Sequence, residues 1–217
     1  MILESLDRTG PQGTEAIRNL KLLSPIVNGL IANPKVSLAL LFVDITSFST
    51  YTSSLSSIEI TAILDQYYQD VLPIIYKHNG EVEKIMGDGI VAVFGPPFTK
   101  GTQKDLLNAA ENCAAEMIMS RYSAKYPLKV ALHYGNLVYY HNKNTSVDEF
   151  YALGKPMTEL FRLESECINK HIGFFGNSDY HYHRIWGYST LGTAWVQQLP
   201  RTVSLKGVDY NQVIDLK

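Results

Sequence analysis

The sequence has little charge imbalance, little cysteine and no long apolar run. Its 217 residues carry 19 Lys+Arg against 21 Asp+Glu, a formal net charge of −2, which argues against a nucleic-acid binder because such proteins usually carry a basic excess. No stretch of about 18 apolar residues is present, so we expect no membrane span. The two cysteines, Cys113 and Cys167, lie in helix-like stretches and are predicted to be reduced, as in a cytoplasmic protein.

Motifs of several common enzyme classes are also missing. There is no GxxxxGK[ST] loop, GxSxG elbow or HExxH pair, which argues against P-loop nucleotide hydrolases, elbow-type serine hydrolases and zinc proteases. His181 and His183 would lie on one face of a strand and could form a metal pair. Because two histidines alone do not complete a metal site, a solvent-exposed strand is the favoured interpretation.

The composition that is present suits one folded domain. Hydrophobic residues make up 46% and charged residues 18%, which is enough for a packed core and unlike a disordered chain. Residues 1–36 predict an N-terminal leader that is helical only from about 15 to 31. We expect residues 37–217 to form the functional domain, which leaves no room in this sequence for a large sensor module.

Two acidic residues stand at the ends of predicted strands. The apolar run at 36–43 predicts a strand buried on both faces, and Asp44 follows it directly. Strands at 81–85 and 89–95 are joined by a tight turn that presents Asp88 at its tip. If the hairpin pairs beside the first strand, the two carboxylates repel each other unless a cation such as Mg²⁺ or Mn²⁺ lies between them. The alternative is that both acids only support their turns.

Hairpins alternate with helices along the rest of the chain. Ser56 and Glu59 form a capping-box pattern that begins a helix, and Gly80 is expected to close it. Mixed hairpins and helices favour the α+β class, a mostly antiparallel sheet with helices packed on one face. Further predicted elements are helices at 105–119 and 156–168 and strands at 128–140, at 150–153 and in the tail up to 217.

Three stretches resemble the signatures of the class III adenylate/guanylate cyclase catalytic domain. They are FVDITSFS at 42–49, VEKIMGDGIVAVFG at 82–95 and LGKPMTELFRLE at 153–164, in the order and at the separations of that family. The resemblance runs from about 36 to 216 and implies the ferredoxin-like fold of these cyclases. It also implies the conversion of a nucleoside triphosphate to its 3′,5′-cyclic monophosphate and pyrophosphate, by in-line attack of the 3′-hydroxyl.

The resemblance assigns roles to the acids and to the turn after the first strand. Asp44 and Asp88 would hold two divalent cations, Mn²⁺ or Mg²⁺, with the backbone carbonyl of Ile45 as a further ligand. These ions would lower the pKa of the ribose 3′-hydroxyl and stabilise the α-phosphate. The triphosphate would lie against a nest of backbone amides, which belong to Thr46, Ser47 and Phe48.

Three further positions would contact the phosphates or the ribose, and two of them depart from the family pattern. Arg162 matches the arginine that stabilises charge on the phosphates. Lys129 falls where a triphosphate-binding arginine often lies, the alternative being a solvated lysine on a strand. Thr158 replaces the asparagine that orients the ribose in the family. In the family the acids and the arginine come from different protomers, which implies a head-to-tail homodimer with active sites at its interface.

Two positions bear on the base of the substrate. Lys84 matches the lysine of adenylate cyclases, where guanylate cyclases have glutamate, and Tyr151 stands where Asp or Thr is usual for adenine and Cys for guanine. A bulky phenol should shrink the base pocket, and a lysine that only donates suits the O4 atom of uracil. The sequence therefore favours UTP, then CTP, over ATP. The alternative for Tyr151 is a core residue, with the base chosen elsewhere.

A bare cyclase domain with an altered base pocket resembles the standalone bacterial pyrimidine cyclases of anti-phage signalling. That resemblance implies a cytoplasmic enzyme whose cyclic UMP is read by a downstream effector protein, without nucleic acid as a partner. Two alternatives stay open. One is an adenylate cyclase, and the other is a degenerate cyclase fold that serves as a nucleotide-sensing or dimerisation module, as the replacements at Thr158 and Lys129 suggest.

Overall fold

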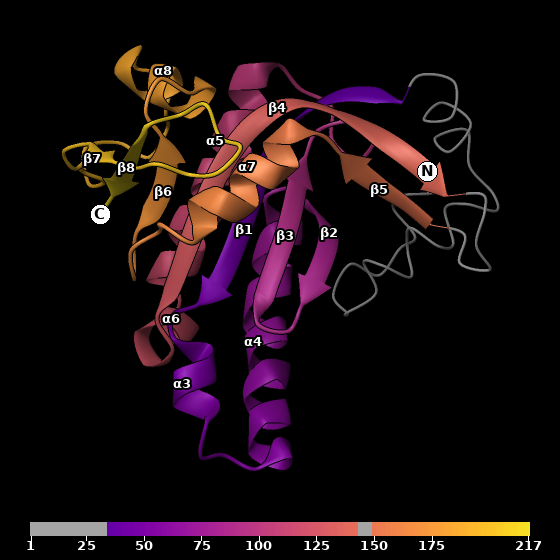
Figure 1. The fold of residues 1–217 in the computed structure, drawn as a ribbon, viewed down its shortest axis with the longest axis vertical. Helices are drawn as coiled ribbons and strands as arrows, with labels where there is room; N and C mark the ends of the chain where they lie inside the picture. The colour runs from indigo at the N-terminus through magenta and orange to yellow at the C-terminus, as the bar shows by residue number, and fades with distance from the viewer. Residues whose placement is uncertain (1–33, 143–148) are drawn as a thin grey trace.

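One twisted sheet organises the chain in the computed structural model, which describes residues 34–142 and 149–217 (Figure 1). The predicted leader helix lies outside these residues. Within them the sheet has eight strands in the order β2-β3-β1-β4-β6-β8-β7, and β5 pairs with β4. All pairings are antiparallel except β4 with β6, which confirms the predicted α+β class. The strands are β1 (Lys35–Ile45), β2 (Glu81–Met86), β3 (Gly89–Phe94), β4 (Leu128–Asn142), β5 (Glu149–Leu153), β6 (Ile172–Phe175), β7 (Arg201–Thr202) and β8 (Gln212–Leu216).

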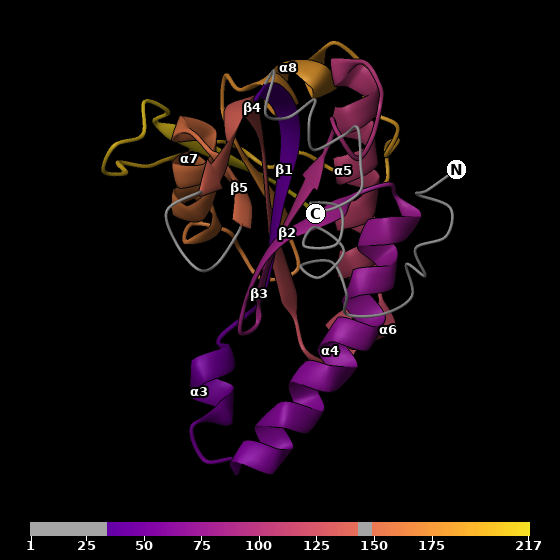
Figure 2. The same cartoon turned by 90° about the vertical axis from the view of Figure 1, so that its right-hand side faces the viewer.

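Helices cover both faces of the sheet, so the prediction of helices on one face was wrong. Figure 2 shows α7 on one side and α4 and α5 on the other. The reason lies in β1, where Leu41 and Val43 face one buried cluster while Leu40 and Phe42 face the other. A strand buried on both faces needs cover on both. The described helices are α3 (Phe48–Thr52), α4 (Ser57–Lys77), α5 (Gln103–Met119), α6 (Arg121–Lys125), α7 (Lys155–Glu164) and α8 (Asp179–Ile185).

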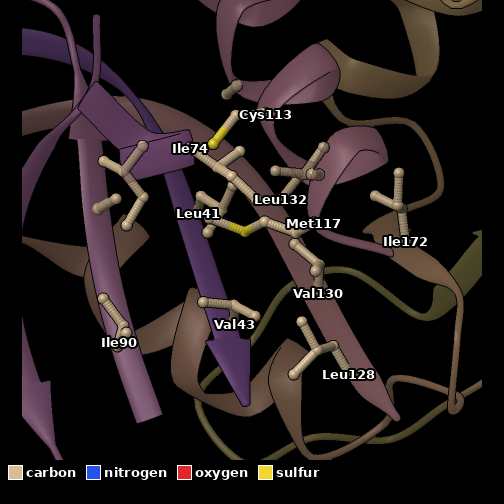
Figure 3. Packing of buried hydrophobic residues seen from close by; sticks show 14 of the residues in the cluster. Leu41, Val43, Ile74, Ile90, Cys113, Met117, Leu128, Val130, Leu132 and Ile172 are labelled. Atoms are coloured by element: carbon tan, nitrogen blue, oxygen red, sulfur yellow. The ribbon is translucent and has the colours of Figure 1, made fainter. Parts of the chain in front are cut away.

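The larger cluster lies between the sheet and the pair α4 and α5. Leu41 and Val43 of β1 meet Val130 of β4 and Met117 of α5 there (Figure 3). Cys113 is buried in the same cluster, and both Cys113 and Cys167 are free thiols, as predicted. None of the helices in the described part of the chain combines the length and the apolar character needed to cross a membrane.

Helix α4 begins as predicted and ends differently. The side chain of Ser56 accepts the N–H of Glu59, and the carboxylate of Glu59 accepts the N–H of Ser56, which completes the capping box. At the other end Asn79, with φ of 60°, takes the left-handed conformation that was expected of Gly80. Gly80 is needed for a different reason, because a Cβ atom there would lie 2.7 Å from the ring of Phe94.

The segment with two histidines is helix α8, not the predicted strand. Ser178 caps this helix by accepting the N–H of His181, a local signal that outweighs the alternation of polar and aromatic residues. His183 is buried with its Nε2 3.0 Å from Oδ1 of Asn108, whereas His181 accepts the N–H of Asn177. The two rings therefore do not form a metal pair. No group of three or more His, Cys, Asp or Glu in residues 34–142 and 149–217 is arranged to hold a metal ion.

Candidate active site

The two acidic residues at strand ends lie together in space. Asp44 is the penultimate residue of β1, and β3 pairs along β1 so that Val43 opposes Ile90. The turn between β2 and β3 thereby places Asp88 beside Asp44, close enough for its carboxyl group to raise the pKa of Asp44. This proximity is the arrangement that the strand and the hairpin predicted.

Two tyrosines of α4 fix the segments that carry these acids. The hydroxyl of Tyr67 donates to the carbonyl of Val43 at 3.4 Å, and the hydroxyl of Tyr68 donates to the carbonyl of Gly87 at 2.6 Å. Tyr67 is fully buried, so the contact with β1 belongs to the core. One helix therefore positions both the strand end and the hairpin tip.

The acid pair has an unusual protonation equilibrium. Burial, followed by the hydrogen bond and the negative charge of Asp88, raises the pKa of Asp44 from 3.8 to about 6. The ammonium of Lys129 acts in the opposite direction and does not outweigh these effects. Two neighbouring carboxylates that do not readily ionise together favour either a proton or a cation between them. Their oxygen atoms are the ligands that hard divalent cations prefer.

Lys129 and a third acid complete the cluster. The Nζ atom of Lys129 lies 3.4 Å from Asp44 and 2.5 Å from Glu164, and its side chain is 18% exposed. The alternative of a solvated lysine on a strand was therefore wrong. Burial raises the pKa of Glu164, with the ammonium of Lys129 partly opposing that rise. Sequence reasoning missed Glu164, although it is the last residue of the third signature stretch.

The turn after β1 differs from the expected cradle of three amides. The N–H of Thr46 donates to the carbonyl of Pro127 at 2.8 Å, so it is not available to a triphosphate, which corrects that part of the prediction. Ser47 has a left-handed backbone with φ of 57°, and Phe48 begins α3. The hydroxyl of Thr46 is buried and has no hydrogen-bond partner among the described residues.

Thr158 and Arg162 lie one turn apart on the exposed face of α7. Both side chains are exposed, whereas Phe161 between them packs edge-on against Phe42 with ring centroids 5.3 Å apart. Within the described residues no ion pair joins Arg162 to Asp44 or Asp88. A single chain therefore does not bring Arg162 into contact with the acids.

The positions predicted to select the base come from adjacent strands. Lys84 is exposed on β2, just after a bulge in the pairing with β3. Tyr151 is half-buried on β5, with its ring centroid 5.8 Å from that of Tyr140. Glu83, in the bulge, accepts the N–H of Ala152 at 2.7 Å and thereby ties β2 to β5. Burial raises the pKa of Glu83, a residue that sequence reasoning missed because bulges leave no clear local signal.

Comparison with known proteins identifies relatives. The family described as Adenylate and Guanylate cyclase catalytic domain matches residues 30–155, more than half of the chain. The uncharacterized protein Rv1320c of Mycobacterium tuberculosis is 25% identical over 125 residues, which cover 58% of this chain and 22% of the relative. The chain thus spans about a fifth of the length of the curated relatives that it matches.

Solved structures share the fold at low sequence identity. The adenylyl cyclase CyaB from P. aeruginosa aligns with a TM-score of 0.71 and 19% identity, over 84% of this chain and 94% of that one. The guanylyl cyclase Cya2 aligns with a TM-score of 0.68 and 21% identity, over 84% and 92% of the two chains. The guanylate cyclase domain of RhGC from Catenaria anguillulae, in complex with GTP, gives 0.67 and 22%, over 83% and 96%. These likenesses establish the fold.

Proposed function

Because the chain belongs to the family of adenylate and guanylate cyclase catalytic domains, we propose that it is a nucleotidyl cyclase that acts on pyrimidine nucleotides. It converts UTP, in preference to CTP and ATP, to the 3′,5′-cyclic monophosphate and pyrophosphate. The observation that carries this proposal is the contact between the carboxyl groups of Asp44 and Asp88 at the end of β1. A cyclic pyrimidine nucleotide then serves as a cytoplasmic second messenger, read by an effector protein in anti-phage defence.

The acid pair suits divalent cations. Asp44, Asp88 and the backbone carbonyl of Ile45 would hold two divalent cations, Mn²⁺ or Mg²⁺. The raised pKa of Asp44 supports this assignment, because burial and the nearby carboxyl group of Asp88 disfavour its ionised form, and a bound cation would stabilise that form. When bound, the cations supply charge neutralisation at the phosphates and lower the pKa of the 3′-hydroxyl.

The basic residues complete the binding of the triphosphate. Lys129 is held beside Asp44 by Glu164, and it can move its ammonium from these carboxylates to a phosphate oxygen as a point charge. Arg162 is exposed on α7, and its planar guanidinium suits two phosphate oxygens at once. Its charge stabilises the negative charge that grows on the phosphates during the in-line attack.

The position of Arg162 supports a dimeric enzyme. Arg162 and Thr158 are exposed and make no contact with the acids of their own chain among the described residues. A head-to-tail homodimer would bring α7 of one protomer to Asp44 and Asp88 of the other, which gives two equivalent sites at the interface. Thr158, shorter than the family's asparagine, would then face the ribose with its hydroxyl.

The preference for a pyrimidine rests on Lys84 and Tyr151. Glu83 keeps the two strands that carry them in a fixed relation. The ring of Tyr151 fills space that a purine needs, and the ammonium of Lys84 can donate to the O4 atom of uracil but not accept from the amino group of cytosine. This combination favours UTP over CTP, and both over ATP.

A second candidate function follows from the same cluster. Lys129 places a positive charge 3.4 Å from Asp44, where a divalent cation would otherwise neutralise that carboxylate. If the ammonium of Lys129 replaces the divalent cation in this way, the chain would bind a nucleotide, or dimerise, without converting the nucleotide to a cyclic product. If the chain is such a degenerate module, we expect its nucleotide binding to be independent of Mn²⁺.

One experiment separates these candidates. The purified chain is incubated with Mn²⁺ and each of UTP, CTP, ATP and GTP, and cyclic products and pyrophosphate are quantified. We expect cyclic UMP as the main product and no product from Asp44→Ala or Asp88→Ala, with the dimer intact by size-exclusion chromatography. Full activity in either variant would exclude the proposed site. Faster turnover of ATP than of UTP would overturn the base assignment, and binding without turnover would favour the degenerate module.

A further inference from the structure

A pocket lies away from the acid cluster, by which we mean Asp44, Asp88, Lys129 and Glu164. It has a volume of about 460 Å³ and is formed by the first turn of α5, by α8 and by the residues that follow α8. In Figure 1, α8 lies at the top of the sheet, whereas the end of β1, the strand that carries Asp44, points toward the bottom. No residue of the acid cluster lines this pocket, so it is a separate feature of the fold.

Three aromatic side chains form one wall of the pocket. Tyr182 of α8 and Trp186, the residue that follows this helix, stack with ring centroids 5.2 Å apart and planes 23° apart. Tyr188 meets Trp186 edge-on at 6.2 Å. Trp186 is 63% exposed, although tryptophan is usually well buried. Exposed, stacked rings beside a cavity are a surface on which another planar ring can stack.

Buried polar contacts hold this aromatic wall in place. The fully buried carboxylate of Glu111 pairs with Arg184 at 2.8 Å and accepts the hydroxyl of Ser189. Asn108 donates to the carbonyl of Tyr188 at 3.1 Å and accepts from His183, whose Nε2 lies 3.0 Å away. The residues on both sides of Trp186 are thus fixed to α5. A rigid wall of this kind binds a ligand without a large cost in ordering.

The charged side chains around the pocket favour a ligand with a negative charge. The Nζ atom of Lys104 lies 4.9 Å from the ring centroid of Tyr188, so the position that a cationic ligand would take over this ring is already filled. The carboxylate of Asp179 accepts from the side-chain amide of Gln103 and is less available to a ligand. Burial lowers the pKa of His183, which keeps that ring neutral near neutral pH. The ammonium of Lys104 can therefore bind an anionic group of the ligand.

We propose that this pocket binds a small molecule that combines a planar heteroaromatic ring with a negatively charged group, such as a nucleoside monophosphate. The ring stacks on Trp186 or Tyr182, and the anionic group contacts the ammonium of Lys104. The volume lies within the range of small-molecule sites, which are lined mainly by apolar and aromatic side chains with a few polar groups. This site is independent of the cyclase reaction and of its base preference.

The chain offers a direct optical test. It contains two tryptophans, Trp186 and Trp195, so Trp195→Phe leaves Trp186 as the only tryptophan. UMP and AMP are titrated into this variant while tryptophan fluorescence is recorded, with uridine, adenosine and choline as comparison compounds. We expect saturable quenching by both monophosphates, at least fivefold weaker binding of the uncharged nucleosides, and none of choline. Adding Asp44→Ala to the same variant should leave the quenching unchanged, because the acid cluster is not part of this pocket.

Substitutions test the two contacts separately. Lys104→Gln should weaken the monophosphates at least fivefold and leave the nucleosides unchanged, whereas Lys35→Gln, an exposed lysine on β1, should change neither. Tyr182→Phe preserves the stack and should bind normally, whereas Tyr182→Ala should bind less, with the circular dichroism spectrum confirming the fold. The absence of saturable quenching at millimolar ligand would overturn the proposal, as would tighter binding of choline than of UMP. Equal binding with glutamine at position 104 would overturn the role of the lysine.

Discussion

The ammonium of Lys129 lies 2.5 Å from the carboxylate of Glu164, a contact that joins the start of β4 to the last residue of α7. The same ammonium is 3.4 Å from Asp44. Lys129 thus connects the acid pair to the helix that carries Arg162. This geometry makes the lysine part of the charge balance of the acid cluster. In the proposed function its ammonium would bind a phosphate oxygen.

Replacing Lys129 should therefore affect nucleotide binding more than cation binding. Lys129→Gln removes one charge-assisted contact with the triphosphate, for which we expect KM for the nucleotide to rise about tenfold or more. Mn²⁺ affinity should stay the same or increase, because a positive charge beside Asp44 is lost. Initial-rate kinetics and titration of Mn²⁺ by its paramagnetic resonance signal measure the two effects.

The control for this prediction is Lys129→Arg. Arginine keeps the charge and adds a fork that suits two phosphate oxygens, so this variant should retain at least the KM of the parent chain. An unchanged KM in Lys129→Gln, with a lower free energy of unfolding, would show that the contact with Glu164 serves only the fold.

The ionised side chain of Asp44 should lower the free energy of unfolding. Its pKa is raised to about 6, so its ionised form disfavours folding at pH 7. In Asp44→Asn we expect turnover to be lost and the free energy of unfolding in EDTA to increase by about 1 kcal/mol, after allowance for solvent screening. Urea denaturation at pH 7 provides the measurement. A less stable Asp44→Asn would mean that the contact with Lys129 outweighs the effect of burial.

Local signals in the sequence predicted the parts of the site that lie on one strand or turn. The apolar run that ends at Asp44, and the two glycines that flank Asp88, identify a strand end and a hairpin tip without any tertiary information. Their pairing follows because the hairpin adds to the same sheet. The capping box at Ser56 was equally local.

Tertiary contacts explain what sequence reasoning missed. Glu83 and Glu164 look like ordinary charged residues on a strand and a helix, and only the packing of β2 on β5 and of α7 beside β4 gives them partners. Helix α8 was mistaken for a strand because its aromatic residues face both the core and the pocket, which hides the helical period. The apolar run in β1 did indicate cover on both faces, but not that α7 would provide it.

Glu83 should make stability depend on pH. Burial raises its pKa above the ordinary value of 4.5, so the folded state holds the proton more tightly and loses stability as the pH rises through a window that begins near 4.5. Glu83→Gln keeps an oxygen that accepts the N–H of Ala152 and removes the charge. We expect the free energy of unfolding of this variant, relative to the parent chain, to be higher at pH 7 than at pH 4.5. Urea denaturation at the two pH values measures it.

Glu59 provides a matched control of opposite sign. Its hydrogen bonds with the side chain and backbone of Ser56 lower its pKa, so its ionised form stabilises the folded state above its unfolded pKa, and this contribution is lost as the pH falls. Glu59→Gln should therefore lose more stability at pH 7 than at pH 4.5. If both variants shifted in the same direction, the burial of Glu83 would not be the source of the effect.

The base preference provides the sharpest prediction for a single residue. In the proposed function the ring of Tyr151 excludes purines. Tyr151→Asp removes this ring and supplies an acceptor for the amino group of adenine, so the ratio of kcat/KM for UTP to that for ATP should fall at least tenfold. Tyr151→Phe keeps the ring and should keep the preference. Tyr140→Phe, which keeps the neighbouring ring 5.8 Å away and removes only its hydroxyl, should keep it as well. An unchanged ratio in Tyr151→Asp, with turnover retained, would assign the choice of base to other residues.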